Sequence, residues 1–327
     1  MNVSQNLTSD ANYTGSSSLG SEFFSQFAIT VTGIPVTGVN ALLCGVIAVS
    51  AELHRKEYIL PFGLGLADAT YGVSLLNAGI ERSYLIYNQE HLDGVTPWYC
   101  ARRLFVILIF LSLTMQSFMN LFIAIDRLIA CVSIKFYMKM TPQHLAGIAF
   151  VGVLASFLIM TLTILSSLSM PSTTMVPKIC FTFSLVPGWV NDVFFWGQLN
   201  AILLSVVIYF AALLTLYSGD SKRVADTFAS ARQRQRKVTQ MLTYVMIANF
   251  ICYFVPNLVF YFMPGFGMSA DMQSFLINTL TTVININVLL NPFIYFAKNS
   301  EIRRAITRSV PLLEKLKWPE TSIVSPS

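Results

Sequence analysis

An acidic residue stands in the middle of an apolar run. Asp68 is the one charged residue in the stretch over residues 58–80. A carboxylate in such a run costs several kcal/mol unless it finds polar partners. Neutral polar residues stand at comparable depth in other apolar runs, namely Asn40, Gln116, Asn287 and Asn291. The pattern predicts a buried polar cluster, which either holds water or a sodium ion and rearranges between states, or is a static hydrogen-bond network between helices.

A charged pair follows directly after another apolar run. Asp126 and Arg127 end the charge-free stretch over residues 104–125. An arginine at such a boundary can pair with the neighbouring carboxylate in one state and, once released, donate up to about five hydrogen bonds to carbonyl groups of a docking partner. Arg127 is therefore a candidate switch. The alternative is an arginine whose guanidinium extends to lipid headgroups.

Two tyrosines and two prolines elsewhere in the apolar runs are candidates for the same machinery. Tyr209 and Tyr295 stand near the ends of their runs, where a hydroxyl can join a water network to Arg127 or, alternatively, anchor a helix at a membrane interface. Pro256 and Pro292 each remove one helix hydrogen bond and permit a kink. Each proline predicts either a hinge or a static bend.

The composition indicates which elements must position these residues. Of the 327 residues, 54% are hydrophobic and 11% are charged, and the mean hydropathy is +0.62. Soluble domains carry about 25% charged residues, so this balance argues against a soluble enzyme. One bilayer crossing takes about 20 apolar residues as a helix. Seven stretches are long enough, namely 27–51, 58–80, 104–125, 145–177, 193–219, 238–270 and 272–297.

These stretches predict an all-α membrane protein, a bundle of seven transmembrane helices, because lipid offers no partners to backbone N–H and C=O groups. The three histidines are far apart and no Cys or His pair has metal-ligand spacing, which argues against a metal-dependent membrane enzyme. The chain carries no internal repeat. We expect three parts, namely a glycosylated extracellular tail over 1–26, the transmembrane domain over 27–297, and a cytoplasmic surface helix and tail over 298–327.

Two independent signals predict the orientation. The first 26 residues hold no Lys or Arg and contain three glycosylation sequons, at Asn2, Asn6 and Asn12. With that end outside, most of the 21 basic residues fall in cytoplasmic loops and the tail, as the positive-inside rule expects. We expect a multi-pass plasma-membrane protein with an extracellular N-terminus and a cytoplasmic C-terminus.

The cysteines fit the same topology. Cys100 and Cys180 fall on the oxidising side, whereas Cys44, Cys131 and Cys252 fall in spans or at the inner face. We expect one disulfide between the outer pair, with two free thiols as the alternative. Closing a loop of about 80 residues stabilises a fold by roughly 4 kcal/mol in the chain-entropy model.

Two motifs carry a family resemblance. The third apolar run ends in Ile125-Asp126-Arg127-Leu128, followed by Cys131-Val132-Ser133-Ile134-Lys135-Phe136-Tyr137, and the seventh ends in Leu290-Asn291-Pro292-Phe293-Ile294-Tyr295. With Asn40, Asp68, Pro256 and the outer cysteine pair, the whole chain resembles the rhodopsin-like (class A) G-protein-coupled receptors. Among these it is similar to divergent chemosensory receptors of nematodes.

The chain departs from the usual pattern of that family. Leu128 replaces the tyrosine of the third-span motif, and Phe254 stands where a tryptophan switch is usual. Arg236 occupies the region of the sixth span where many members have an acidic partner for the third-span arginine. We therefore expect no lock between the third and sixth spans.

The resemblance implies a ligand pocket in the outer half of the bundle, beneath the loop that carries Cys180. Its expected lining is Phe105, Ile109, Phe254, Asn257, Tyr261, Thr281 and Asn285. The outer third span has no acid to anchor an amine, and the seventh span has no lysine for a retinal Schiff base. A small neutral or weakly polar molecule, or a short peptide, fits this set. Arg102 and Arg103 suit an anionic ligand, although headgroups or loop acids are the more common partners.

Two inner segments complete the expected signalling surface. Residues 231–237 are rich in Arg and Lys, and Arg234, Arg236 and Lys237 are expected either to contact a G protein or to bind anionic lipid. After Asn299, apolar residues recur at helical spacing, which predicts an amphipathic helix on the membrane surface.

We therefore interpret the chain as a receptor, not an enzyme, that couples an extracellular ligand to a heterotrimeric G protein, with membrane lipids as further partners and no nucleic acid. It needs no cofactor, apart from the sodium ion that Asp68 would hold. Ligand would stabilise an arrangement in which the sixth span moves away from the third. The alternatives are a ligand-gated channel or transporter, or a receptor-like protein that no longer couples.

Overall fold

The computed structural model describes residues 19–171, 173–218 and 229–309. Within them, seven helical segments are long and apolar enough to cross a membrane. These are α2 (Leu19–Val49), α3 (Lys56–Tyr87), α5 (Leu104–Val132), α7 (Pro142–Ser166) with its extension η2 (Ser167–Ser169), α8 (Gly188–Tyr217), α9 (Ala229–Asn249) continued through η5 (Phe250–Phe254) into α10 (Val255–Phe262), and α11 (Ala270–Lys298). The predicted seven-helix bundle is confirmed.

The helices run beyond the charge-free stretches. α2 begins at Leu19, α3 begins at Lys56, and α5 continues past Asp126 to Val132. Absence of charge therefore underestimates helix length, because a helix can carry charged residues where it leaves the apolar layer.

Local sequence sets several helix starts. The Thr96 side chain accepts from the Tyr99 N–H at the start of α4 (Pro97–Ala101), and Ser269 accepts in the same way at the start of α11. Thr141 and His144 form a reciprocal cap on α7, where Pro142 takes the first helical position. Such side-chain oxygens satisfy backbone donors that a helix leaves without partners at its N-terminus.

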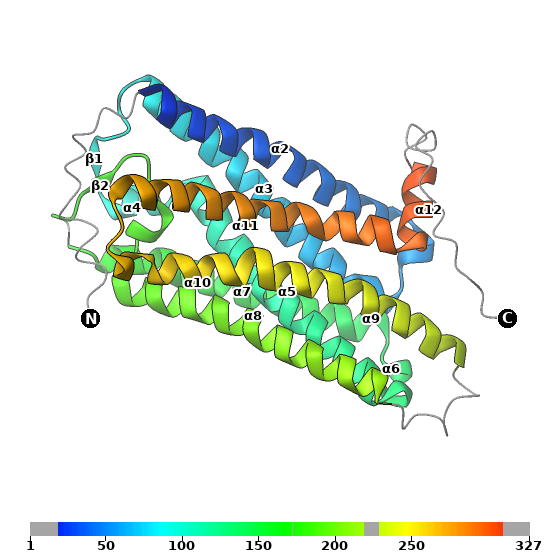
Figure 1. The fold of residues 1–327 in the computed structure, drawn as a ribbon. Coiled ribbons are helices and arrows are strands. Elements are labelled where there is room, and N and C mark those ends of the chain that lie inside the picture. Colours follow the sequence, from blue (N-terminus) through cyan, green and yellow to red (C-terminus); the bar gives the residue numbers. More distant parts are fainter. Residues whose placement is uncertain (1–18, 172, 219–228, 310–327) are drawn as a thin grey trace.

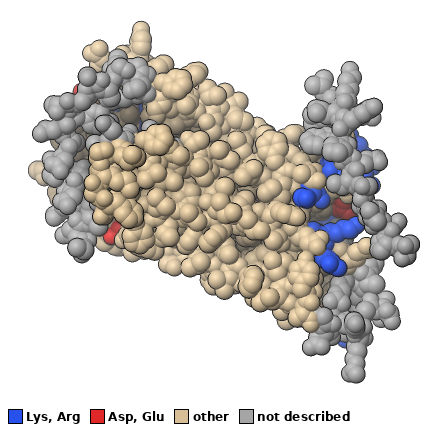
Figure 2. All heavy atoms as spheres, viewed as in Figure 1, with Lys and Arg blue, Asp and Glu red and all other residues tan. Residues whose placement is uncertain are grey.

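The connections gather at the two ends of the bundle (Figure 1). At one end, β1 (Gly94–Val95) pairs antiparallel with β2 (Val176–Pro177), with α4 and the turns η3 (Thr182–Ser184) and η6 (Met263–Phe266) in the neighbouring connections. At the opposite end lie α6 (Ile134–Lys139), α12 (Ser300–Ser309) and the turn η1 (Ala51–Leu53). Figure 2 shows Lys, Arg and acidic side chains together near the α12 end, whereas the broad middle of the visible face carries none. This uncharged band is what a helix bundle presents to lipid.

Two large apolar clusters fill most of the described bundle, and a third, smaller one contains Val36 and Val288. The cluster toward the α12 end, here called the inner cluster, includes Leu43, Leu64 and Tyr295. The cluster toward the β1–β2 end, here called the outer cluster, includes Phe105, Phe110, Met115 and Phe194. The predicted polar residues lie between them, so the bundle has a polar layer at mid-height.

Helices α2 and α3 pack closely because glycines face the neighbouring backbone. A Cβ at Gly79 would collide with Thr30, and one at Gly72 would lie 2.5 Å from Thr37 Oγ1. Small residues let two helix backbones approach within a membrane, where association depends on packing.

The sixth span changes its helical geometry before Pro256. Residues Phe250–Phe254 form a π-helical turn, and α10 follows with Pro256 in its first turn. A π-helical turn is rare and occurs frequently at functional sites. Pro292, in contrast, lies inside α11, which is continuous from Ala270 to Lys298.

The helix predicted after Asn299 is present as α12. Its apolar residues Ile302, Ala305 and Ile306 are buried in the inner cluster together with Leu53 and Tyr58, so this face packs on protein rather than being open to lipid. Ion pairs hold the helix to the first inner connection, namely Arg308–Glu52 at 2.7 Å and Arg55–Glu301 at 3.2 Å.

Candidate functional site

Arg127 lies at the inner end of α5 and is 0% exposed. Its Nε and Nη2 donate to Asp126 Oδ2, with Nε 2.9 Å from that oxygen. Nη2 also donates to the Tyr137 hydroxyl at 2.8 Å, and Nη1 donates to Gln235 Oε1 at 2.8 Å. The buried guanidinium is thus neutralised by one carboxylate and held by side chains from α5, α6 and α9.

A link between the third and sixth spans is present, contrary to the sequence-based expectation. Arg236, used for that expectation, is exposed and lies 5.7 Å from the ring centre of Tyr217. Its neighbour Gln235 faces inward, accepts from Arg127, and donates from Nε2 to Glu57 Oε1 at 3.4 Å. The helix phase selects the residue one position earlier, so a neutral amide, rather than the basic Arg236, faces Arg127.

Two further basic residues, Arg234 and Lys237, are predicted for this surface. Lys237 is exposed. The side chain of Arg234 lies outside the described residues, as do the sequons at Asn2, Asn6 and Asn12.

Tyr137 is held from two sides. The Lys56 ammonium donates to the Tyr137 carbonyl and to the Met140 carbonyl, and it lies 4.0 Å from the Tyr137 ring centre. Burial raises the pKa of the Tyr137 hydroxyl. The hydroxyl therefore stays neutral and can accept from Arg127.

The other two predicted tyrosines are also buried near this end. Tyr209 donates to the Thr239 carbonyl on α9, which is a second contact to the sixth span. The Tyr295 hydroxyl is buried, and none of the described residues hydrogen-bonds to it. Among the described residues, neither tyrosine forms a direct hydrogen bond with Arg127.

The polar layer is centred on Asp68, which is 1% exposed. Gln116 Nε2 donates to Asp68 Oδ1 and Asn291 Nδ2 donates to Asp68 Oδ2, both at 2.9 Å. These bonds join the second, third and seventh spans. Asn40 instead donates to the carbonyls of Val36 and Val288, so the structure does not join it to Asp68.

A second set of amides lies beside Asp68. Asn287 donates to Asn249 Oδ1 at 2.8 Å, and Asn249 donates to Asn120 Oδ1 at 2.9 Å. Sequence reasoning included Asn287 but missed Asn120 and Asn249. Asn120 stands one helical turn after Gln116 on the same face, and this spacing could have identified it.

A cavity of about 10 Å³ lies between these groups, lined by Leu64, Asp68, Gln116, Ser117, Asn120, Ile202, Asn249, Tyr253, Asn287 and Asn291. Its volume is about the minimum that holds one water molecule. Among the described residues, no donor reaches Asn287 Oδ1 or Asn291 Oδ1. One carboxylate and two free amide oxygens fit a small hard cation such as sodium, because such ions prefer oxygen ligands. The same oxygen atoms also suit a single water molecule.

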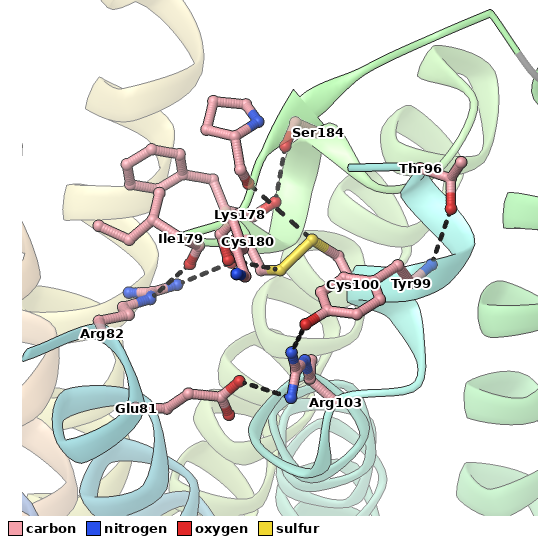
Figure 3. Close-up of a disulfide and its surroundings, with 12 residues drawn as sticks. Glu81, Arg82, Thr96, Tyr99, Cys100, Arg103, Lys178, Ile179, Cys180 and Ser184 are labelled. Atoms are coloured by element: carbon pink, nitrogen blue, oxygen red, sulfur yellow. Dashed lines mark hydrogen bonds and ion pairs between the residues drawn. A yellow bond between two sulfur atoms is a disulfide. The ribbon is translucent and has the colours of Figure 1, made fainter. Parts of the chain in front are cut away.

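The opposite end holds the predicted disulfide, which is confirmed. Cys100 and Cys180 are joined with their Cα atoms 5.4 Å apart. Arg82 points at the loop (Figure 3), where its Nε donates to the Ile179 carbonyl at 3.0 Å and its Nη2 donates to the Cys180 carbonyl at 2.9 Å. Its guanidinium also lies 5.1 Å from the Phe105 ring centre. Sequence reasoning missed Arg82.

The two arginines considered for an anionic ligand have protein partners. Arg103 forms an ion pair with Glu81 at 3.0 Å and donates to the Tyr99 hydroxyl (Figure 3). Arg102 is exposed, with its guanidinium 5.6 Å from the Tyr99 ring centre.

Three of the predicted pocket residues pack on protein in the outer half. Phe105 is buried beneath Arg82, and Ile109 is half-buried against the outer cluster. Tyr261 lies against two aromatic rings of α8, with its ring centre 5.2 Å from Phe195 and 4.7 Å from Trp196.

Two of the polar residues predicted for the pocket form hydrogen bonds within the protein. Asn257 donates to the Tyr253 carbonyl at 2.7 Å, and Asn285 accepts from the Tyr71 hydroxyl at 3.0 Å. Thr281 is half-buried.

At the expected switch position, the residue before Phe254 is the more deeply buried one. Phe254 is half-buried and stacks on Phe250, with ring centres 5.2 Å apart. Its neighbour Tyr253 is the buried side chain of the π-helical turn. Helical pattern alone does not reveal a π-helical turn, so sequence reasoning could not assign Tyr253.

Seven membrane-spanning helices, with a disulfide at one end and one buried, hydrogen-bonded arginine at the other, define a class of multi-pass receptors. The sequence model of the family "7 transmembrane receptor (rhodopsin family)" matches residues 39–295. The chain belongs to this family, which is one of receptors and not of enzymes.

Mammalian olfactory receptors are among the similar proteins. The chain is 22% identical over 302 residues to human "Olfactory receptor 1E1" and 21% identical over 299 residues to mouse "Olfactory receptor 7A42". It is 23% identical over 314 residues to gorilla "Olfactory receptor 1G1". Each comparison covers 88% of both chains. The resemblance to nematode receptors stays a prediction.

Proposed function

We propose that this receptor is chemosensory and converts binding of a small, neutral or weakly polar molecule, or a short peptide, into activation of a heterotrimeric G protein. The observation that carries the coupling step is the buried guanidinium of Arg127, held by side chains from three helices. The names of the similar olfactory receptors support the chemosensory assignment.

The contacts of Arg127 suggest how the switch works. The described arrangement represents the resting state, because Gln235 and Tyr209 both attach the sixth span to the rest of the inner end. Movement of α9 away from both α5 and α8 breaks both contacts and frees one side of the guanidinium. Arg127 can then donate to backbone carbonyls of the G protein. Ligand acts by stabilising this second arrangement.

We further propose that the Arg127 end faces the cytoplasm and the disulfide end faces outside, in the plasma membrane. An oxidising compartment supports the Cys100–Cys180 bond, and the basic side chains near α12 fit the positive-inside rule.

The Asp68 cavity is a regulatory site in this proposal. A sodium ion there would be held by the Asp68 carboxylate and by the amide oxygens of Asn287 and Asn291, and its positive charge would stabilise the ionised carboxylate. Gln116 and Asn291 orient the carboxylate by donating to its two oxygens. The alternative is a static network between helices.

The test is ligand-dependent G-protein dissociation in transfected cells, with volatile and peptide libraries applied to the wild-type receptor and Arg127→Ala in parallel. We expect a response in the wild type and none in the variant. A current that persists in both with G proteins blocked would instead establish a channel. Silence in both, with confirmed surface expression, would contradict coupling and favour a receptor-like protein that no longer signals.

A further inference from the structure

A pocket of about 290 Å³ lies at the inner end of the bundle, between the turn η1 and the helix α12. It is lined by Ser50, Ala51, Glu52, Ala305 and Arg308. Pockets that take small molecules start at about 300 Å³, so this one suits a compact polar group rather than a large ligand. Neither the Arg127 contacts nor the Asp68 layer uses any of these five residues.

The pocket carries one charge of each sign, and each charge comes from a different element. Arg308 Nη1 on α12 donates to Glu52 Oε1 near η1 at 2.7 Å. The two side chains stay 65% and 54% exposed. Exposed ion pairs contribute little to stability, because water competes for both charges. A ligand that offers both charges can therefore replace this pair at small cost.

The pocket lies where the first span leaves the membrane. That span ends at Val49 and the next one begins at Lys56, so the lining residues 50–52 come directly after the apolar segment. Val49 is 80% exposed, and Gly45 and Ala48 on the same face of α2 are exposed too. An acyl chain can lie along this face. From there α12 turns away from the direction of α11 (Figure 1), so a lipid on α2 brings its headgroup to the pocket.

The charges of the pocket match a zwitterion. A guanidinium binds phosphate through two parallel hydrogen bonds, which suits Arg308. A primary ammonium has three N–H donors, and the Glu52 carboxylate and the Ser50 hydroxyl can accept them. The charges of Arg55 and Arg304 also act on Glu52. A site of arginines alone would select the most anionic lipid, so Glu52 is the group that selects for an amine.

We propose that the pocket between η1 and α12 binds the headgroup of phosphatidylethanolamine, with the phosphate on Arg308 and the ammonium on Glu52 and Ser50. The bound headgroup replaces the direct contact between the two side chains and joins α12 to the first inner connection through the lipid. Assignment to the cytoplasmic leaflet rests on the orientation in the proposed function, whereas recognition of the headgroup does not.

The experiment is native mass spectrometry of the purified full-length receptor. It is titrated with phosphatidylethanolamine, phosphatidylcholine and phosphatidylglycerol that carry identical acyl chains. Glu52→Gln and Arg308→Gln each remove one charge, and Ala51→Phe fills the pocket from an exposed position without touching the ion pair. The control, Glu90→Gln, removes the acid of another exposed ion pair, Lys178–Glu90 at the disulfide end. Thermal unfolding verifies that each variant is folded.

We expect the wild type to bind its first ethanolamine lipid about 3- to 10-fold more tightly than its first choline lipid, because a choline headgroup has no N–H to donate. Glu52→Gln should abolish this preference and strengthen binding of phosphatidylglycerol, since Arg308 loses its competing partner. Arg308→Gln should weaken binding of all three lipids, because each carries a phosphate. Ala51→Phe should also abolish the preference, and the control should match the wild type.

Two results would overturn the proposal. Wild-type affinities that are equal for the three lipids, or that follow negative charge alone, would refute selection of a zwitterion. A preference for the ethanolamine lipid that both Glu52→Gln and Ala51→Phe retain would place that lipid outside the pocket. If either charge variant fails to fold, Ala51→Phe decides alone. None of these measurements needs an agonist, so failure of the receptor to activate a G protein would refute the proposed function and leave the lipid site standing.

Discussion

Two arginines lie at opposite ends of the bundle and have different kinds of partner. Arg127 is fully buried and is held by side chains, namely Asp126, Tyr137 and Gln235. Arg82 is part-buried and donates to two backbone carbonyls of the loop that the disulfide closes. Both guanidiniums also lie near an aromatic ring.

The difference lies in what the partners can do. Carbonyls next to a disulfide stay where the covalent bond holds them, so Arg82 fixes the loop over the outer end. Gln235 belongs to α9, which moves relative to α5 in the proposed mechanism, so that the Arg127 contact would open and close. In the proposed mechanism the same residue type is thus a clamp at one end and a switch at the other, according to the mobility of the element that carries its partner.

Arg127→Ala is expected to have the largest effect. Signalling should be lost because no other side chain of α5 can supply the guanidinium donors at that end, while surface expression should stay close to wild type. The measurement is ligand-dependent G-protein dissociation normalised to surface receptor. Arg127→Lys should restore little, because an ammonium lacks the planar fork. Normal signalling by Arg127→Ala would remove the distinction between switch and clamp.

Arg82→Ala should show the opposite pattern. Two carbonyls lose a charged donor, which should destabilise the purified receptor by about 2–3 kcal/mol and lower surface expression. Signalling per surface receptor should persist. Thermal unfolding in detergent checks stability, and Arg82→Lys, which keeps the charge without the fork, should be intermediate. Unchanged stability in Arg82→Ala would contradict the clamp.

Gln235→Leu should raise ligand-independent signalling about 3- to 10-fold, because the sixth span loses its hydrogen bonds to Arg127 and Glu57 while the packing volume is similar. Basal G-protein activity is the measurement. Gln240→Leu is the matched control at an exposed glutamine of the same helix, whose Nε2 donates to the Tyr217 hydroxyl, and it should leave basal activity at the wild-type level. A rise in the control, or none in Gln235→Leu, would exclude Gln235 as the link.

Asp68→Asn should change agonist response and abolish any effect of sodium. Asparagine removes the negative charge that a cation would need but keeps the shape. Agonist curves are compared in sodium chloride and in choline chloride. A wild-type curve that is identical in the two salts would favour the static network.

The smallest effect is expected at α12. The hydrogen bond and charge of Arg308 lower the pKa of the Glu52 carboxyl below its ordinary value of 4.5. A carboxyl with a lowered pKa contributes stability above its unfolded-state pKa, and this contribution is lost as pH falls through the folded-state pKa. The mobility of a spin label at Arg304→Cys should rise slightly on acidification through that range, and Arg308→Gln should remove the pH step. An equal step in Arg308→Gln would assign the change to another group.

The sequence predicted the features that depend on composition and covalent chemistry. Charge-free length predicted seven spans, and the sidedness of Cys100 and Cys180 predicted their disulfide. The cost of burying Asp68 predicted polar partners, and Gln116 and Asn291 do bond to it. These inferences need no knowledge of how helices rotate about their axes.

Helix phase and local geometry account for most of the misses. Sequence reasoning missed Gln235 because the position of a residue along the chain does not show which side of the helix it faces. In the structure Arg236 faces outward and Gln235 faces Arg127. Tyr253 depends on a π-helical turn, which shifts every later side chain of that span. Asn40 stands at the right depth but faces the Val288 backbone instead of Asp68. The depth of a residue in the membrane can be predicted from its place in an apolar run. The direction in which its side chain points depends on how the helix packs against its neighbours.

The glycine contacts between α2 and α3 bear on how the protein is made. These two helices are consecutive in sequence, so their packing at Gly72 and Gly79 needs no later segment. The hairpin can therefore assemble in the bilayer while the ribosome is still translating the rest of the chain, since local contacts form early. Gln235, the sixth-span partner of Arg127, lies 108 residues later in the chain and is therefore synthesised later. Biogenesis thus begins with the α2–α3 hairpin, before the sixth-span partner of Arg127 has been made.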